Sequence, residues 1–279
     1  MKVEAFYIAI VIALAQLTTS IGQWQMKSFA GGGVSSSNGI NPLLASLNGT
    51  YNIWYNDYLD SLILPEPTGH IIRYINGTGI YPLAGTGVVG YAGDGGPATS
   101  ARFSSPRGVC GTTSGAVYVV DTGHHCIRRV DIVTGIVSLL AGNCGTSGDS
   151  IAGSVPAAFA FNSPVACAVD SAGSIYVADS SNCKVNSISS SLTSVSLAAG
   201  DGNCNAPNVA GRVGSPTGLA VDTTGVLYIA TSTLLKQLST QGTLSTLAGS
   251  AAVGNSDGVI SSATFRGVRA VFADSSGAL

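Results

Sequence analysis

Short apolar stretches alternate with turns rich in glycine, serine and threonine along most of the chain. Runs of about five residues, many of them β-branched, recur between these turns; clear examples are 126–130, 136–140, 218–222 and 226–230. Runs of this length bounded by glycine-containing turns predict β-strands. After the N-terminus, no stretch combines the apolar spacing of an amphipathic helix with a cap and a stop. The pattern therefore predicts an all-β sandwich, barrel or propeller.

The strand pattern itself repeats. Each copy ends in an Ala-Gly pair, and these pairs begin at Ala30, Ala84, Ala141, Ala199 and Ala248. A Phe-x-x-Pro motif opens two of the copies, at Phe103 and at Phe161. The copies are spaced by about 49 to 58 residues and contain four strands each, which is typical of a propeller blade. The repeat thus selects a β-propeller of four-stranded blades.

Composition narrows the function classes. Only 9% of the 279 residues are charged, against roughly 25% in ordinary soluble domains. The net charge is -2, from 12 Lys and Arg against 14 Asp and Glu, which excludes a nucleic-acid binder with a basic face. With 45% hydrophobic residues, the chain has enough apolar surface to form a core and is not a disordered chain.

The N-terminus resembles a secretory signal peptide. Lys2 precedes an apolar run over 5–17, and the small residues Thr18 and Ser20 follow it. The run is shorter than the ~20 residues that span a bilayer, so we expect cleavage near residue 20 rather than a membrane anchor or a buried helix. Every later apolar run is too short to span a membrane. We therefore expect residues 1–20 to be removed and the rest to be secreted or extracellular.

Cysteines and glycosylation motifs agree with secretion. The six cysteines form an even set with no Cys-x-x-Cys pair, which favours disulfides over a zinc or redox motif; they are Cys110, Cys126, Cys144, Cys167, Cys183 and Cys204. Sequons begin at Asn48 and Asn76, and both are candidate glycosylation sites.

Blade two carries a family resemblance. Residues 90–99, the strand over 117–119 and residues 121–130 resemble NHL-repeat β-propellers, especially the secreted, teneurin-like kind. The resemblance extends from about Met26 to the C-terminus. It implies that strand A, after Phe-x-x-Pro, is innermost, that strands B and C follow, and that strand D, ending in Ala-Gly, is outermost.

The resemblance also implies a blade count. Four complete blades are expected near 50–84, 107–141, 165–199 and 217–248, and a fifth copy supplies only strand A at 268–274. Propellers of this family usually close with six blades, and 24–30 resembles an outer strand that would complete the last one. We therefore expect the propeller domain, residues 21–279, to be incomplete at its C-terminus; a natural protein of four blades and one strand is the alternative.

Within this blade assignment, the cysteine positions predict three pairs. Cys110 and Cys126 lie at the start of strand A and after the B–C turn, and Cys167 and Cys183 occupy these places one blade later, each moved back by one residue. A shared shift keeps two partners on one face of the sheet, which favours Cys110–Cys126 and Cys167–Cys183. The remaining pair, Cys144–Cys204, would join two successive loops.

Two sets of polar residues could form a catalytic site. His70 and His125 recur at one repeat position and could bind a metal ion, as in the six-bladed lyases that the fold resembles, but copies three and four have Cys183 and Leu235 nearby. Repeated carboxylates could bind calcium, as in six-bladed lactonases; they are Asp121, Asp170, Asp179 and Asp222. Because both sets recur with the repeat, we favour structural roles in turns.

Two further features have simple structural interpretations. The segment 93–96 lacks the residues of a phosphate or calcium loop and predicts a tight turn with positive φ at glycine. Arg128 and Arg129 lie on strand C with alternating exposure, and a solvated face is the default expectation.

These features favour a secreted module that binds a protein or a glycan. A metal-dependent lyase or hydrolase with its site at the channel mouth is one alternative, and a structural subunit of an extracellular assembly is another. We expect no cofactor, no nucleic-acid partner and no membrane span in the mature chain.

Overall fold

The computed structural model describes residues 30, 33, 35–47, 49–150, 153–250, 252–260 and 262–273. The expected signal peptide at 1–20, the expected clasp at 24–30 except for Ala30, and the sequon at Asn48 lie outside the described residues. Among the described residues, no helix is long and apolar enough to cross a bilayer.

Four antiparallel sheets of four strands make up the fold, which confirms the expected β-propeller architecture. Blade 1 contains β1 (Trp54–Asn56), β2 (Ser61–Glu66), β3 (Ile71–Ile75) and β4 (Ile80–Ala84). Blade 2 contains β5 (Gly108–Gly111), β6 (Ala116–Asp121), β7 (Cys126–Asp131) and β8 (Ile136–Ala141). Blade 3 contains β9 (Pro164–Val169), β10 (Ile175–Asp179), β11 (Lys184–Ile188) and β12 (Val195–Ala199). Blade 4 contains β13 (Pro216–Val221), β14 (Leu227–Thr231), β15 (Leu235–Leu238) and β16 (Leu244–Ala248).

Helical structure in the described residues is limited to three-residue 3-10 turns. These turns are η1 (Pro42–Leu44), η2 (Pro67–Gly69), η3 (Ala98–Ser100), η4 (Thr122–His124), η5 (Pro156–Ala158) and η6 (Ser180–Asn182). Three of them, η2, η4 and η6, form the B–C turns of blades 1, 2 and 3.

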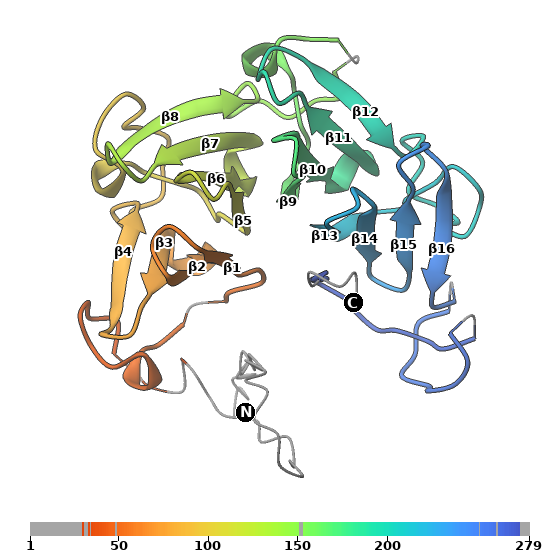
Figure 1. The fold of residues 1–279 in the computed structure, drawn as a ribbon, viewed down its shortest axis with the longest axis horizontal. Coiled ribbons are helices and arrows are strands. Elements are labelled where there is room, and N and C mark those ends of the chain that lie inside the picture. The colour runs from red at the N-terminus through yellow and green to blue at the C-terminus, as the bar shows by residue number, and fades with distance from the viewer. Residues whose placement is uncertain are drawn as a thin grey trace, which may run out of the picture.

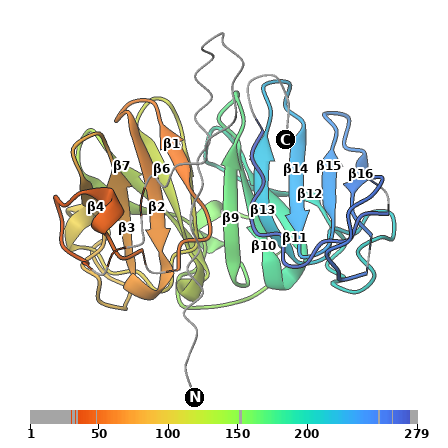
Figure 2. The same cartoon turned by 90° about the horizontal axis from the view of Figure 1, so that it is seen from below.

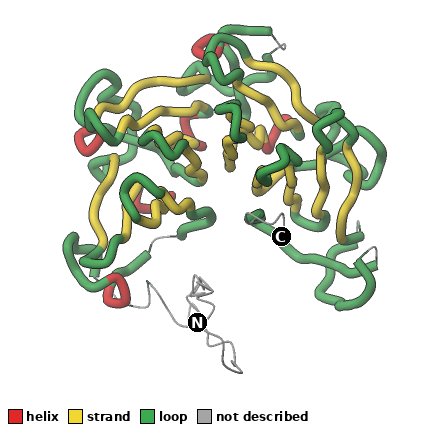
Figure 3. The backbone as a smooth tube through the Cα atoms, in the orientation of Figure 1, coloured by secondary structure: helices red, strands yellow, loops and turns green. Residues whose placement is uncertain are grey.

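The blades are arranged around a common centre. Strands β1, β5, β9 and β13 lie innermost and β4, β8, β12 and β16 form the outer rim, so that the four blades describe an arc (Figure 1). Seen from the side, the strands run between two faces of the molecule (Figure 2). Because strands alternate in direction, the B–C turns and the loops from strand D to the next strand A, here called the D–A loops, share one face. Loops join the strands of every blade, and the short helical turns lie among these loops (Figure 3).

The core lies between neighbouring blades. Phe103 and Phe161 are both completely buried, and each belongs to an apolar cluster with residues of the blades on its two sides. Val213 holds the same place before blade 4 and is also buried. Burial of one such side chain stabilises the fold by roughly 2–3 kcal/mol. This explains why an apolar residue recurs three positions before the proline at the start of strand A.

The fifth copy is only partly as expected. Residues 268–273 form no strand in the described part of the chain. The segment nevertheless lies where an inner strand belongs. A Cβ on Gly218 would meet Arg269 O and Ala270 Cα at 2.8 Å, just as one on Gly108 would meet Val165 O and Ala166 Cα at 2.7 and 2.9 Å.

Candidate functional site

The two histidines considered as weak candidates for metal ligands connect neighbouring blades, in keeping with the favoured structural role. Ser105 N–H donates to His70 Nδ1 at 3.1 Å, and Ser163 N–H donates to His125 Nδ1 at 2.9 Å. Each histidine ends a B–C turn in the left-handed region, with φ of 51° and 56°. Each one therefore binds the loop before strand A of the following blade, and we call this contact the histidine latch.

A carboxylate binds the residue next to each latched serine. Ser104 N–H donates to Asp121 Oδ1 at 2.8 Å, and Asn162 N–H donates to Asp179 Oδ1 at 2.7 Å. Both aspartates are fully buried at the end of strand B, but neither caps the turn that follows it, contrary to the expected role. The backbone of each Phe-x-x-Pro loop is thus held from two blades at once.

The other repeated carboxylates cap turns as expected. Asp170 Oδ1 accepts hydrogen bonds from Ala172 N–H and Ser174 N–H in the A–B turn of blade 3. Asp222 Oδ1 accepts from Thr224 N–H and Val226 N–H in blade 4, and Tyr228 OH donates to its second oxygen. The repeat therefore distributes its carboxylates over separate structural positions. In the described part of the chain, no group of three or more His, Cys, Asp or Glu residues is placed to hold a metal ion.

Burial raises the pKa of Asp179 to about 6. Hydrogen bonds from Asn162 N–H and from the amide of Asn182 oppose that shift, and Asn186 Nδ2 donates to the same carboxyl at 3.1 Å. The burial of this carboxyl therefore makes a charged state costly even though its oxygens have partners.

Strand C is irregular at one position in all four blades. The C–D register shifts next to Arg73, Arg128, Asn186 and Lys236. These side chains are polar, and at most 3% of any of them is exposed. A bulge re-aims the side chain that it displaces, so the repeat places a buried polar residue here in every blade.

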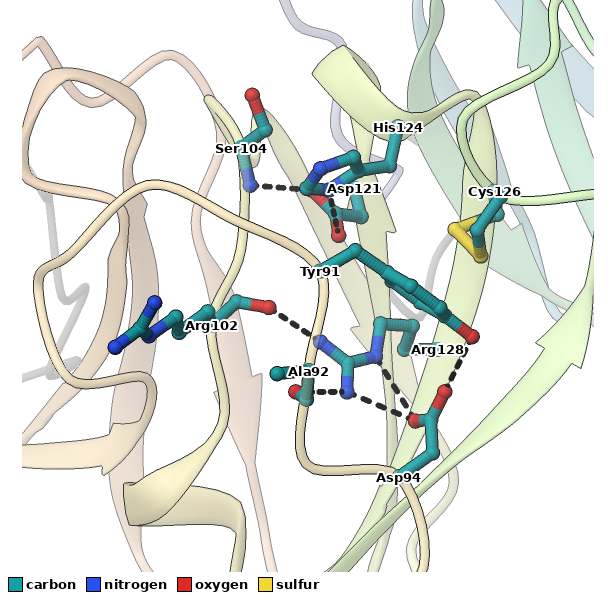
Figure 4. The surroundings of a disulfide bond; sticks show 10 residues. Tyr91, Ala92, Asp94, Arg102, Ser104, Asp121, His124, Cys126 and Arg128 are labelled. Carbon is teal, nitrogen blue, oxygen red and sulfur yellow. Dashed lines mark hydrogen bonds and ion pairs between the residues drawn. A yellow bond between two sulfur atoms is a disulfide. The ribbon is translucent and has the colours of Figure 1, made fainter.

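Arg128 is the most elaborate case and corrects the expectation of a solvated face. Its guanidinium is fully buried and donates to Asp94 Oδ1 at 2.8 Å, to Ala92 O at 3.0 Å and to Arg102 O at 2.6 Å (Figure 4). It also lies 4.6 Å from the centroid of the Phe103 ring. The neighbouring Arg129 is 40% exposed, as expected.

The Arg128 contacts fix the D–A loop before blade 2. Within the expected tight turn at 93–96, Gly93 and Gly95 have φ of 94° and 81°, which confirms the predicted positive φ. Tyr91 OH donates to Asp94 Oδ2 at 2.6 Å, and burial together with this bond raises the pKa of Tyr91 to about 12. Sequence reasoning missed Asp94 and Arg128 as partners because nothing in strand periodicity shows which side of strand C a loop covers.

All six cysteines are paired, but the predicted pairs are wrong. The bonds are Cys110–Cys167, Cys126–Cys144 and Cys183–Cys204, with Cα separations of 5.7, 5.1 and 5.2 Å. The first joins strand A of blade 2 to strand A of blade 3. The other two each tie a D–A loop to the end of the B–C turn of the preceding blade.

Register explains the local pairs. Ile127 of β7 faces Ala141 of β8, so Cys126 lies beside Gly142 and within reach of Cys144. Strands A and C, in contrast, are separated by strand B, which places them about 10 Å apart within one blade. The C–D hairpin therefore provided a signal for Cys126–Cys144 and Cys183–Cys204, whereas Cys110–Cys167 depends on how blades pack.

Every D–A loop exposes a large apolar side chain. The first loop exposes Val88 and Val89, and the later loops expose Val155, Val209 and Val253. The loops are nevertheless fastened: Arg128 holds the first, and disulfides at Cys144 and Cys204 hold the next two. The first three D–A loops thus combine exposed apolar side chains with a restrained backbone, an arrangement that suits recognition of a partner.

Comparison with known families identifies one segment. Residues 103–130 match the family model of the NHL repeat, which confirms the resemblance at blade 2. The matched segment contains Phe103, Asp121 and Arg128, which form the contacts described above. No curated protein matches the chain.

Several solved structures share the fold. A chain of the nidogen/laminin complex is 12% identical, with 91% of this chain and 77% of that chain covered and a TM-score of 0.58. A gluconolactonase from Xanthomonas campestris is 13% identical, with coverage of 83% and 69% and a TM-score of 0.54. An auxiliary nutrient binding protein from Bacteroides thetaiotaomicron is 11% identical, with coverage of 89% and 71% and a TM-score of 0.53. At these identities the similarity shows the fold alone.

Proposed function

We propose that the protein is a secreted or cell-surface module that binds an extracellular protein or glycan on the face formed by its D–A loops. The observation that carries this proposal is the exposure of apolar side chains on all four of those loops. Three disulfides support an oxidising, extracellular environment, where such bonds persist. A role as structural subunit of an extracellular assembly would use the same face.

The roles of the repeated polar residues favour binding over catalysis. His70 and His125 use Nδ1 to accept backbone hydrogen bonds, so a metal ion could reach only Nε2 of each. The metal-dependent lyase or hydrolase remains a prediction, and zinc or calcium that is retained after dialysis and lost in His125→Asn would support it.

The test compares two faces of one blade. Val88 and Val89 are 50% and 55% exposed on a D–A loop, and Val133 is 67% exposed in a C–D turn on the opposite face. The secreted protein, its Val88→Asp/Val89→Asp variant and a Val133→Asp control are assayed against arrays of glycans and extracellular domains. We expect a ligand that the control binds normally and the double variant binds at least tenfold more weakly. Equal loss in both variants, or no ligand on either array, would contradict the proposal.

A further inference from the structure

One position at the start of the innermost strand recurs in every repeat, and the region around the centre that these positions border is here called the channel mouth. It is the residue that follows the proline, or its equivalent, at the start of strand A: Arg107 follows Pro106, Val165 follows Pro164, and Thr217 follows Pro216. Arg269 takes this place in the fifth copy, as shown by the matching surroundings of Gly108 and Gly218. In blade 1, Trp54 pairs with Ile63 as Cys110 pairs with Tyr118 in blade 2. Tyr51, three residues before Trp54, therefore corresponds to Arg107. Because these positions begin the innermost strands, they surround the centre on the side of the D–A loops (Figure 1).

Two of these side chains are arginines that meet at one aromatic ring. Arg107 Cζ lies 5.6 Å from the centroid of the Tyr51 ring, and Arg269 Cζ lies 4.6 Å from it. Both arginines are exposed, and Tyr51 is half-buried. Such cation–π contacts orient a guanidinium without neutralising it.

The two charges have no counter-charge in the described part of the chain. Four other arginines have carboxylate partners at 2.8 to 3.2 Å, namely Arg73, Arg128, Arg129 and Arg212, whereas Arg102 and Arg266 also form no ion pair with a described carboxylate. No ion pair to a described carboxylate forms at Arg107 or Arg269. The uncharged Val165 and Thr217 hold the equivalent positions in blades 3 and 4. Positive charge therefore accumulates on one side of the mouth in a chain whose net charge is -2.

We propose that Arg107 and Arg269 bind acidic side chains of a partner peptide at the channel mouth. Guanidinium groups bind carboxylates through two parallel hydrogen bonds, and arginine clusters recognise acidic peptide motifs. The guanidiniums lie over the Tyr51 ring and compete with a sugar for stacking on it, which favours a peptide over a glycan. This inference rests on the proposed binding function and specifies the partner of that face.

The test uses a model ligand of defined charge. Fluorescence anisotropy measures binding of a labelled hexaglutamate peptide to the secreted protein in low salt, with hexaglutamine as the neutral probe. We expect binding of hexaglutamate only, weakened by added salt because the contact is electrostatic. The double variant Arg107→Gln/Arg269→Gln should bind at least tenfold more weakly.

The control removes the same charge elsewhere. Arg102 and Arg266 are exposed and do not contact Tyr51, so Arg102→Gln/Arg266→Gln should retain affinity within about twofold. Equal loss in both double variants would show that net charge rather than the mouth binds the peptide, and absence of hexaglutamate binding would also overturn the inference. Arginine-dependent binding of polyglucuronate in place of hexaglutamate would overturn the choice of a peptide.

These failures are distinguishable from failure of the proposed function. The Val88→Asp/Val89→Asp experiment measures binding to the D–A face through residues that are not part of the arginine pair. A ligand lost in that variant and retained by Arg107→Gln/Arg269→Gln would uphold the binding module and overturn the acidic partner.

Discussion

The junction between blades 2 and 3 and the junction between blades 3 and 4 use one backbone plan with different side chains. At the first junction, Cys110–Cys167 links the inner strands, and His125 and Asp179 bind consecutive N–H groups of the intervening loop. At the second, Cys183 occupies the position of His125 with nearly the same φ, 53°, and is bonded to Cys204.

The carboxylate of the first junction is also replaced at the second. Thr231 stands where Asp179 stands one blade earlier, and its hydroxyl accepts a hydrogen bond from Leu234 N–H within its own turn. Neither Gly214 N–H nor Ser215 N–H has an acceptor among the residues that the structure describes. The left-handed residue of the loop also moves, from Ser163 in the first junction to Gly214 in the second. The repeat therefore fixes the turns, and the side chains at two positions decide whether two N–H groups of the loop before the next blade are bound.

The largest effect should come from the bond between inner strands. Its sequence separation is 57 residues, so the loop-entropy model gives Cys110→Ala/Cys167→Ala a loss of ~4 kcal/mol in the free energy of unfolding. The matched variant Cys126→Ala/Cys144→Ala opens a separation of only 18 residues and should lose ~3 kcal/mol. Urea unfolding measures both losses. A smaller loss for the first variant than for the second would contradict the importance of this link.

The next effect concerns how blades 2 and 3 hold their D–A loops. Arg128→Met removes a fully buried side chain that donates to two backbone carbonyls and leaves Ala92 O and Arg102 O without this donor, which should cost about 3 kcal/mol. The corresponding loop of blade 3 is held by Lys184 and Asp149, whose side chains are 19% and 48% exposed. Lys184→Met should therefore cost less than about 1 kcal/mol. Equal losses on urea unfolding would show that burial does not distinguish these two anchors.

These two anchors show where sequence reasoning succeeds and fails. Strand positions, turns and the blade boundaries followed from local periodicity, because a strand and its hairpin neighbour are close in sequence. The burial of Arg128 did not, because it depends on the path of the loop that contains Asp94, 34 residues earlier. The bond Cys110–Cys167 was missed for the same reason, because it joins two different sheets and depends on how those sheets pack.

The third effect depends on pH. Since burial raises the pKa of Asp179 from 3.8 to about 6, the folded protein holds this proton more tightly than the unfolded chain. The contribution to stability is complete below about pH 4, is lost as the pH rises to about 6, and amounts to an order of 2–3 kcal/mol. Asp179→Asn should flatten this part of the stability profile. An unchanged slope between pH 4 and 6 in the variant would assign the pH dependence to other groups.

The smallest effect isolates the latch. Asn tolerates positive φ but is too short to reach the next blade, so His125→Asn leaves Ser163 N–H without its acceptor and should cost about 1–2 kcal/mol. His70→Asn removes the same contact with Ser105 and should cost a similar amount. Thermal unfolding compares the two variants with the parent protein, and no change in either would show that the latch is energetically neutral.

Native-state hydrogen exchange at the three equivalent serines tests the central claim most directly. The amides of Ser105 and Ser163 are bound by histidines of the preceding blades, whereas no described residue accepts from Ser215 N–H. We expect the first two amides to exchange at least tenfold more slowly than the third, and His125→Asn to accelerate exchange at Ser163 without affecting Ser105. Equal exchange at all three serines would contradict the claim that the repeated histidines fasten one blade to the next.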